Sequence, residues 1–258
     1  MILIELMQRG QRMGRDGVRF HLLCGTHRRM TSQPSVSTPD TRPIIGDPNY
    51  NPPNDPIAIL HEDDELLIVD KPAGLLSQPG LGPALADCQE SRARDYCPTI
   101  SLVHRLDRDT SGILIFAKNA KTHRHLGLQF ERRHLTKRYI AVVSGQVKEE
   151  SGLIDAPLIA DWPNRPMQKI CETGKPSKTE WTVTERGTAT TRLDLNPLTG
   201  RTHQLRVHLL SIGHPILGDV LYAPPEAKAE RLHLHATEMT IRHPIGGAHL
   251  TISCPCPF

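Results

Sequence analysis

Short apolar runs bounded by turn-forming residues are the sequence feature that most constrains how this chain can fold. The stretch IAILHEDDELLIVDKPAGLLSQPG, which begins at Ile57, holds two such runs separated by an acidic turn, and it predicts a hairpin that leads into a loop. The run GILIFAK at 112–118 has the length and branching of a buried strand. Further strands are predicted for KRYIAVVSG at 137–145, KTEWTVTE at 178–185 and TTRLDLNP at 190–197.

Helical signals are fewer and irregularly placed among these strands. Residues 84–95 are weakly helical, and residues 120–134 form an amphipathic basic pattern in which Leu126 and Phe130 lie four apart. Within residues 201–213, Leu205, Leu209 and Ile212 recur at helical spacing, and a glycine and a proline then end the pattern. Because strands and helices do not alternate regularly, we predict an α+β fold with a mixed, mainly antiparallel sheet and flanking helices.

The composition is that of a globular protein without a membrane span. The chain has 258 residues, of which 38% are hydrophobic, and no apolar stretch approaches the roughly 20 residues that a spanning helix needs. The N-terminus is a poor secretory signal, and six scattered cysteines suit a reducing compartment, so we expect a cytoplasmic protein. Only Cys254 and Cys256 lie close together, and they lack the second ligand cluster of a structural zinc site, so no metal is predicted.

The first 47 residues differ in texture from the rest of the chain. They show no sustained periodicity, and TSQPSVSTPDTRP at 31–43 has too few apolar side chains to order itself. We therefore predict a disordered or mis-started tail over 1–47 and a catalytic domain over 48–258, with Met30 as an alternative start.

Charge is distributed unevenly along the chain. Residues 41–99 carry ten acids and four bases, a net charge of −6, whereas residues 101–139 carry nine bases and three acids, a net charge of +6. A local basic field of this kind is typical either of a surface that binds a polyanion or of a solvated basic helix.

Three side chains are candidates for chemistry. Asp107 lies in the polar burst HRLDRDTSG directly before a buried strand, where a scaffold would hold a carboxylate rigidly at a cleft. Tyr139 lies in a strand pattern beside two bases, and Arg206 follows an apolar helix position so that it can face a cleft. Each alone is more typical of a structural residue. Together, a carboxylate, a phenol and a guanidinium suggest covalent or general-base chemistry on something planar and anionic.

These segments resemble the signature blocks of a known family, the RNA pseudouridine synthases of the RluA type. The blocks are VDKPAGLL, HRLDRDTSG with ILIFAKN, KRYIAVVSG and TGRTHQLRVHLLSIGHPILGD, in that order. NYNPPNDP and ADWPNRPMQKICETGKPSKTEW are similar to the family's dual-specificity members, which act on tRNA and 23S rRNA. The first 47 residues do not match the family and contain no recognisable S4 RNA-binding module.

The resemblance implies a fold, a set of site residues and partners. It implies the pseudouridine synthase fold with a central RNA-binding cleft, Asp107 as catalytic aspartate, Tyr139 as active-site tyrosine and Arg206 as the arginine paired with the aspartate. Arg105 matches the family's arginine implicated in base flipping. The further substrate-binding residues expected are His104, Leu106, Arg108, Lys71, Arg201, His203 and Gln204. The implied partners are tRNA and 23S rRNA, and the protein is expected to be a monomer that needs no protein partner.

The implied reaction isomerises uridine to pseudouridine after the base has left the helical stack. The implied targets are uridine 32 in the tRNA anticodon stem-loop and uridine 746 in 23S rRNA. No cofactor is expected, because the reaction gains and loses neither atoms nor electrons. The alternative is a non-catalytic RNA-binding or RNA-chaperone protein of the same fold. HRLD superficially resembles the His-Arg-Asp catalytic loop of kinases. A kinase is disfavoured because a leucine separates the arginine from the aspartate, and because the chain shows neither the glycine-rich phosphate loop nor the Asp-Phe-Gly motif of that class.

Overall fold

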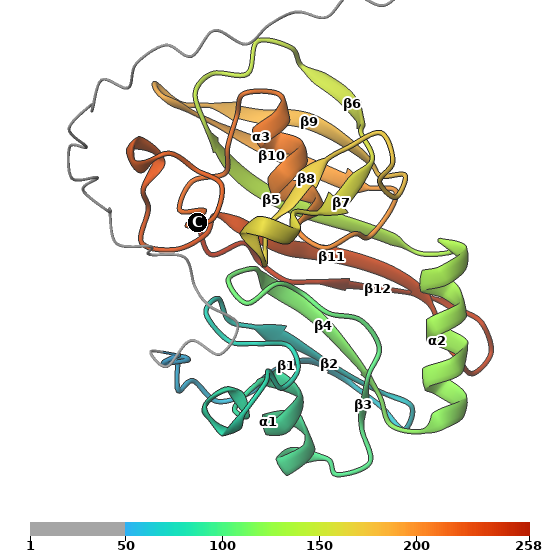
Figure 1. The fold of residues 1–258 in the computed structure, drawn as a ribbon. Helices are drawn as coiled ribbons and strands as arrows, with labels where there is room; N and C mark the ends of the chain where they lie inside the picture. Colours follow the sequence, from blue (N-terminus) through green and yellow to red (C-terminus); the bar gives the residue numbers. More distant parts are fainter. Residues whose placement is uncertain (1–49) are drawn as a thin grey trace, which may run out of the picture. The chain divides into compact units, whose positions relative to one another are not determined.

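The computed structural model describes residues 50–258, so the tail predicted over 1–47 lies outside the described residues. Ten strands form one sheet, and two short strands form a separate hairpin (Figure 1). The helices are α1 (Gln89–Tyr96), α2 (Ala120–Arg132) and α3 (Gln204–Ser211). The strands are β1 (Ala58–Glu62), β2 (Leu66–Lys71), β3 (Ser101–Leu102), β4 (Ser111–Ala117), β5 (Thr136–Ser144), β6 (Ser151–Asp155), β7 (Leu158–Ala160), β8 (Gln168–Ile170), β9 (Lys178–Arg186), β10 (Thr190–Pro197), β11 (Leu234–Arg242) and β12 (His249–Ser253).

The large sheet has the strand order β1-β2-β4-β11-β5-β10-β9-β6, with β3 paired to β4 and β12 paired to β11. Among its strand pairs only β4 and β11 run parallel, and the others are antiparallel. The predicted α+β class with a mixed, mainly antiparallel sheet is therefore confirmed.

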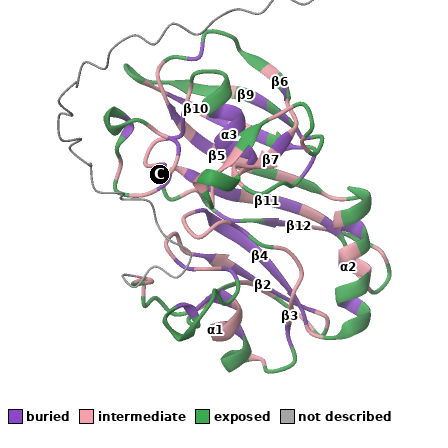
Figure 2. Ribbon diagram, viewed as in Figure 1, coloured by how far each residue is buried: buried purple, intermediate pink, exposed green. Residues whose placement is uncertain are grey.

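In the N-terminal half of the sheet, the central strands are covered on both faces. Every residue of β4 is buried, as are five of the six residues of β2 (Figure 2). On one face, Ile113 and Ile115 pack with Leu126 of α2, and on the other, Leu114 and Phe116 pack with Ala93 of α1. Burial on both faces is the reason that LLIV and GILIFA are continuous apolar runs rather than alternating patterns.

In the C-terminal half, the strands alternate between buried and more exposed positions. Thr191, Leu193 and Leu195 of β10 are buried while the residues between them are not. The buried leucines pack against Leu205 and Leu209 of α3, so this half of the sheet has its core on the side of that helix.

The two halves meet where β4 lies beside β11. This parallel pairing holds for only two positions, Ser111 with His235 and Gly112 with Ala236. Gly112 has φ 109°, and a Cβ built on it would lie 2.3 Å from the carbonyl oxygen of Ala236. Only glycine permits this approach, and the loop directly before it carries Asp107, the predicted catalytic aspartate.

Several details differ from the sequence prediction. The helix predicted over 84–95 begins at Gln89, because Cys88 and Ser91 form a capping box there. The helix predicted over 201–213 begins only after His203, whose φ is 53°, and ends before Ile212, which is 36% exposed rather than part of the apolar stripe. Strands β3, β6, β7, β8, β11 and β12 were not predicted. No helix among the described residues is long and apolar enough to cross a membrane.

Candidate active site

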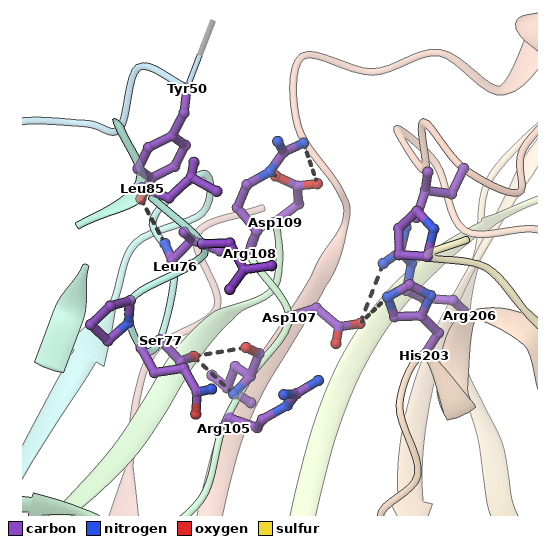
Figure 3. Close-up of a pocket in the computed structure, with 17 residues that line it drawn as sticks. Tyr50, Leu76, Ser77, Leu85, Arg105, Asp107, Arg108, Asp109, His203 and Arg206 are labelled. Carbon is purple, nitrogen blue, oxygen red and sulfur yellow. Dashed lines mark hydrogen bonds and ion pairs between the residues drawn. The ribbon is translucent and has the colours of Figure 1, made fainter. Parts of the chain in front are cut away.

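Asp107 lies in the loop between β3 and β4, and backbone contacts hold this loop on both sides of it. Ser77 Oγ donates to the carbonyl of Leu106 (2.7 Å) and accepts from the Leu106 amide (3.0 Å). Lys71 Nζ donates to the carbonyl of Arg108 (2.9 Å). The loop after β2 therefore fixes the position of the Asp107 backbone, as Figure 3 shows for the Ser77 contacts.

A buried arginine holds the carboxylate of Asp107. Arg206 Nη1 lies 3.3 Å from Asp107 Oδ2, across 99 residues of sequence. The other side of the guanidinium makes two 2.7 Å bonds to Asp219. Burial opposes the charge of Arg206, but the hydrogen bonds to Asp219 raise its pKa above the usual value. Arg206 is thus a permanent cation with one edge left for Asp107.

His203 approaches the same carboxylate oxygen from the start of α3. Its Nε2 lies 3.9 Å from Asp107 Oδ2 (Figure 3), and its Nδ1 lies 2.7 Å from Tyr222 Oη. Tyr222 Oη accepts from the Gln168 amide, so its own proton is free to be donated to His203 Nδ1. In that tautomer the Nε2–H of His203 faces Asp107. Burial lowers the pKa of His203, which favours the neutral ring near pH 7.

Tyr139 projects from β5 into the boundary between two of the hydrophobic clusters. Burial, and next the negative charge of Asp107, raise the pKa of its phenol well above the usual value. The phenol is therefore neutral at physiological pH and provides an aromatic surface near the carboxylate.

Two cavities meet at Asp107. The larger, about 530 Å³, extends toward Tyr50 and the loop after β2, and the smaller, about 360 Å³, contains Tyr139, Phe130 and Lys137. The residues that line both cavities are Arg105, Leu106, Asp107, His203 and Arg206. Both volumes lie in the range that holds a small organic group such as a nucleobase with its sugar.

Some basic side chains at or near these cavities are exposed at their walls, whereas others form ion pairs with acidic side chains. Arg105 and Arg201 are exposed at the cavity walls. Arg108 forms an ion pair with Asp109 (2.8 Å), and Lys118, expected in the basic field, pairs with Glu62 of the acidic segment (2.8 Å). The pair between Lys118 and Glu62 therefore neutralises part of the charge difference between the acidic and basic segments.

No group of three histidine, cysteine or acidic side chains in residues 50–258 is arranged to hold a metal ion. The arrangement around Asp107 instead combines an oriented carboxylate, a fixed cation, a neutral imidazole and a phenol.

Comparison with known proteins assigns the chain to a family. Residues 65–211 match the model of the RNA pseudouridylate synthase family. Over 220 residues the chain is 50% identical to the dual-specificity RNA pseudouridine synthase RluA of Escherichia coli strain K12, covering 83% of this chain and all of that protein. The chain belongs to the RluA-type RNA pseudouridine synthases. It is also 50% identical to the RluA of Vibrio parahaemolyticus, over 81% of this chain and 87% of that protein.

Solved structures agree with this assignment. The chain resembles human RNA pseudouridylate synthase domain containing 1 with a TM-score of 0.67 and 29% identity, over 78% of this chain and 84% of that one. Human RNA pseudouridylate synthase domain containing 4 shares the fold, with a TM-score of 0.65 and 24% identity. The protein is an RNA pseudouridine synthase with the fold that the sequence motifs implied.

The structure of this pseudouridine synthase brings together most residues that its sequence singled out. Ten of the eleven predicted site residues line at least one of the two cavities. The ten are Asp107, Tyr139, Arg206, Arg105, His104, Leu106, Arg108, Arg201, His203 and Gln204.

Lys71 is the exception. It is fully buried, lines neither cavity, and its ammonium donates to the carbonyls of Pro72, Leu75 and Arg108. Burial lowers the pKa of Lys71 to about 7, against the attraction of Asp109 and Asp107. Lys71 therefore fixes the loop that carries Asp107, and its side chain does not reach either cavity.

Two cavity-lining residues are also used internally. His104 stacks on Phe130 with 4.8 Å between ring centroids, and burial lowers its pKa to about 3, which keeps it neutral. Gln204 bonds Thr199, Thr179 and backbone groups through both ends of its amide. These bonds shape the loop before α3 and leave the amide of Gln204 little capacity for RNA.

Sequence reasoning missed Asp219, Tyr222 and Ser77. Asp219 is the last residue of the block TGRTHQLRVHLLSIGHPILGD, so its position there was the available signal. Tyr222 and Ser77 act through contacts with His203 and Leu106, at 19 and 29 residues of separation, for which the sequence holds no local sign.

Proposed function

We propose that this enzyme converts uridine to pseudouridine in both tRNA and 23S rRNA, at uridine 32 of the anticodon stem-loop and uridine 746 of the rRNA, with Asp107 as the catalytic carboxylate. The observation that carries the role of Asp107 is its position: a carboxylate held by Arg206 at the point where two nucleoside-sized cavities meet. The dual specificity of the RluA proteins that the chain resembles supports the choice of two RNA substrates.

The target uridine must leave the RNA helix before Asp107 can reach it. Extrusion of a base costs a few kcal/mol, which contacts between exposed cations and phosphates offset. Arg105 is exposed and lines both cavities, so it is placed to occupy the space that the base leaves. Arg201, exposed at the wall of the smaller cavity, is placed to contact the backbone.

The smaller cavity is the proposed position of the extruded uracil, because it holds Tyr139 and Asp107 together. In the reaction the bond between N1 and C1′ breaks, the base rotates, a bond forms between C5 and C1′, the C5 proton leaves and N1 gains a proton. Tyr139 stacks on the uracil throughout. Burial, and next the charge of Asp107, raise the pKa of Tyr139 and keep its phenol protonated, so the phenol itself cannot accept the C5 proton. If Asp107 bonds covalently to the nucleoside its charge is lost, and the phenol then releases its own proton more readily. N1 gains a proton, and the phenolate of Tyr139 is the base that takes the C5 proton.

Arg206 has a positioning and electrostatic role in this scheme. Its two bonds to Asp219 prevent it from rotating, so Nη1 stays aimed at Asp107 and favours the ionised carboxylate. His203, with Nε2 toward the same oxygen, is placed to orient the carboxylate.

A cytoplasmic location and a monomeric state remain predictions from the sequence.

Asp107→Asn tests the proposal. The variant keeps the shape of the side chain but removes the charge, so we expect RNA binding to be retained while pseudouridine formation falls by about 10³-fold or more. Transcripts of tRNA and 23S rRNA are incubated with each protein, and pseudouridines are mapped by carbodiimide treatment and primer extension.

Asp155→Asn is the matched control, because Asp155 is an exposed residue of β6 outside both cavities, and it should remain fully active. Full activity of Asp107→Asn would refute the role of Asp107. Modification of only one RNA by the unaltered protein would refute dual specificity while leaving the role of Asp107 intact.

A further inference from the structure

The turn of the β7–β8 hairpin, residues 161–167, exposes the aromatic side chain of Trp162 and reaches the larger active-site cavity through Pro166. We propose that this turn is an RNA-binding platform on which Trp162 stacks a base near the extruded uridine and Arg165 contacts a phosphate. The proposal rests on the proposed function, since it names a recognition element for the same RNA substrates.

Trp162 is exposed to an unusual degree for its type. Its exposed fraction is 65%, and the guanidinium carbon of Arg165 lies 3.4 Å from the centroid of its ring. An indole and a guanidinium stacked at a surface combine an aromatic plane with a positive charge, which is the combination that single-stranded RNA segments bind through base stacking and phosphate contacts. The cation also makes the platform selective for anionic partners over neutral apolar ones.

The turn is rigid enough to serve as a platform. Asp161 accepts from Asn164 Nδ2 (2.8 Å) and from Lys169 Nζ (3.1 Å). Two 2.9 Å backbone bonds, from Asp161 to Met167 and from Met167 to Asn164, close the turn. Because these bonds order the turn before RNA arrives, little further conformational entropy is lost when a base stacks on Trp162.

The turn also borders the site directly. Pro166 lines the larger cavity together with Asp107 and Arg206. Gln168, at the start of β8, donates its amide to Tyr222 Oη, and Tyr222 contacts His203, whose Nε2 faces Asp107. The hairpin is thus tied through two side chains to the residues around the catalytic carboxylate.

A basic hollow adjoins the smaller active-site cavity beside strand β7 of the hairpin. A cavity of about 500 Å³ is lined by β7, by Lys175 and by Arg201. Arg201 also lines the smaller active-site cavity, so the two hollows share the loop 200–202. A strand of RNA that leaves the active site over this loop would remain in a positively charged path beside the hairpin.

The test is a comparison of RNA binding by Trp162→Ala, Trp162→Phe and the unaltered protein. Binding of a fluorescent anticodon stem-loop is measured by anisotropy, and kcat and KM for pseudouridine formation are measured separately. Loss of one stacked base weakens binding by about tenfold, so we expect Trp162→Ala to raise Kd and KM about tenfold with kcat little changed. Trp162→Phe should retain most of the affinity, because a phenyl ring still stacks.

An abasic scan of the RNA identifies the base. One abasic position that weakens binding to the unaltered protein should cause no additional loss with Trp162→Ala, because the partner is already missing. Leu153→Ala is the control, since Leu153 is 54% exposed on β6 and lines none of the cavities described above. Melting temperatures within a few degrees of the unaltered protein exclude global misfolding of the variants.

Unchanged affinity of Trp162→Ala, or the same abasic profile for both proteins, would overturn the platform. Self-association of the unaltered protein that Trp162→Ala abolishes, with RNA affinity unchanged, would assign the turn to a protein contact instead. The proposed function fails by a different result, which is the absence of pseudouridine from both RNAs with the unaltered protein.

Discussion

Asp219 is the residue on which the geometry of the catalytic group depends most. Its side chain is 1% exposed, makes both short bonds to Arg206, and accepts from the amides of Leu221 and Tyr222. It therefore fixes the guanidinium that contacts Asp107 and also the start of the segment that carries Tyr222, the partner of His203.

Asp219→Asn is expected to reduce kcat about 100-fold. The amide keeps one acceptor oxygen but places an NH₂ group against a guanidinium N–H, so Arg206 loses one of the two bonds that fix its orientation toward Asp107. Because breaking a buried ion pair leaves a charge uncompensated, stability should also fall, by about 3–5 kcal/mol. Steady-state kinetics well below the variant's melting temperature should show lower kcat with KM for RNA nearly unchanged.

A purely structural role for Asp219 would instead change kcat and KM together or reduce only the fraction of folded enzyme. Asp155→Asn again serves as the control, because Asp155 forms an exposed pair with Lys178 whose loss costs little.

At the scale of elements, a small ion-pair cluster joins the turn between β1 and β2 to the turn that follows β11. Asp63, in the turn between β1 and β2, accepts from the amides of Glu65 and Leu66 and contacts His61 (2.7 Å) and His243 (3.1 Å), which follows β11. Burial acts to raise the pKa of Asp63, but the hydrogen bonds from His61 and the other donors outweigh it and lower the pKa to about 2. The pKa of His243 is raised, first by its bond to the Ile245 carbonyl and then by Asp63.

These shifts predict a pH window for the contribution of the cluster. A carboxyl with a lowered pKa stabilises the fold above its unfolded pKa of about 3.9 and loses this effect as pH falls toward 2. A histidine with a raised pKa stabilises the fold below its unfolded value of about 6.5 and loses this effect as pH rises through its folded pKa. The melting temperature of Asp63→Asn should therefore fall furthest below that of the unaltered protein between about pH 4 and 6.5, by about 2–4 °C.

Thermal melts from pH 2 to 9 measure this difference. The gap should narrow at both ends of the range, and a gap independent of pH would contradict the assignment. Asp64→Asn, at the exposed neighbouring position, is the control.

For the described part of the molecule as a whole, the active site depends on the junction between the two halves of the sheet. Asp107 belongs to the half that contains β4, whereas Tyr139 and Arg206 belong to the half that contains β5 and α3. The close approach of Gly112 to Ala236 holds these halves in register.

Gly112→Ala should damage both stability and activity. Its Cβ would lie 2.3 Å from one backbone atom and 2.7 Å from another, at a φ of 109° that alanine rarely adopts. We expect a loss of about 2–5 kcal/mol in the free energy of unfolding and a loss of activity at temperatures where the variant is still folded. Denaturant unfolding and single-turnover pseudouridine formation measure the two effects.

Gly127→Ala is the matched control. Gly127 lies inside α2 with open space around its Cβ position, so alanine should raise stability by about 0.5–1 kcal/mol. Equal stabilities for the two variants would contradict the role given to the junction.

The sequence by itself determined the strand-rich α+β class, the buried strand after Asp107, the helix that carries Arg206 and, through its motifs, the family. These features are local, because the apolar period, turn residues and motif spacing are written within a few neighbouring positions. Strand β11 was missed because its place is set by β4 and β5, far away in the chain, and β12 in turn pairs with β11.

Which polar residues are exposed at the cavities and which are bonded within the fold follows from the tertiary structure alone. Lys71, Gln204, Arg105 and Arg201 all belong to the family's signature blocks, yet the first two are buried and bonded internally while the other two are exposed. The pairing of Asp219 with Arg206 and the position of Pro166 at the wall of the larger cavity likewise depend on segments that meet only after folding. Burial and the supply of hydrogen-bond partners are properties of the assembled chain, so a motif identifies such residues without separating their roles.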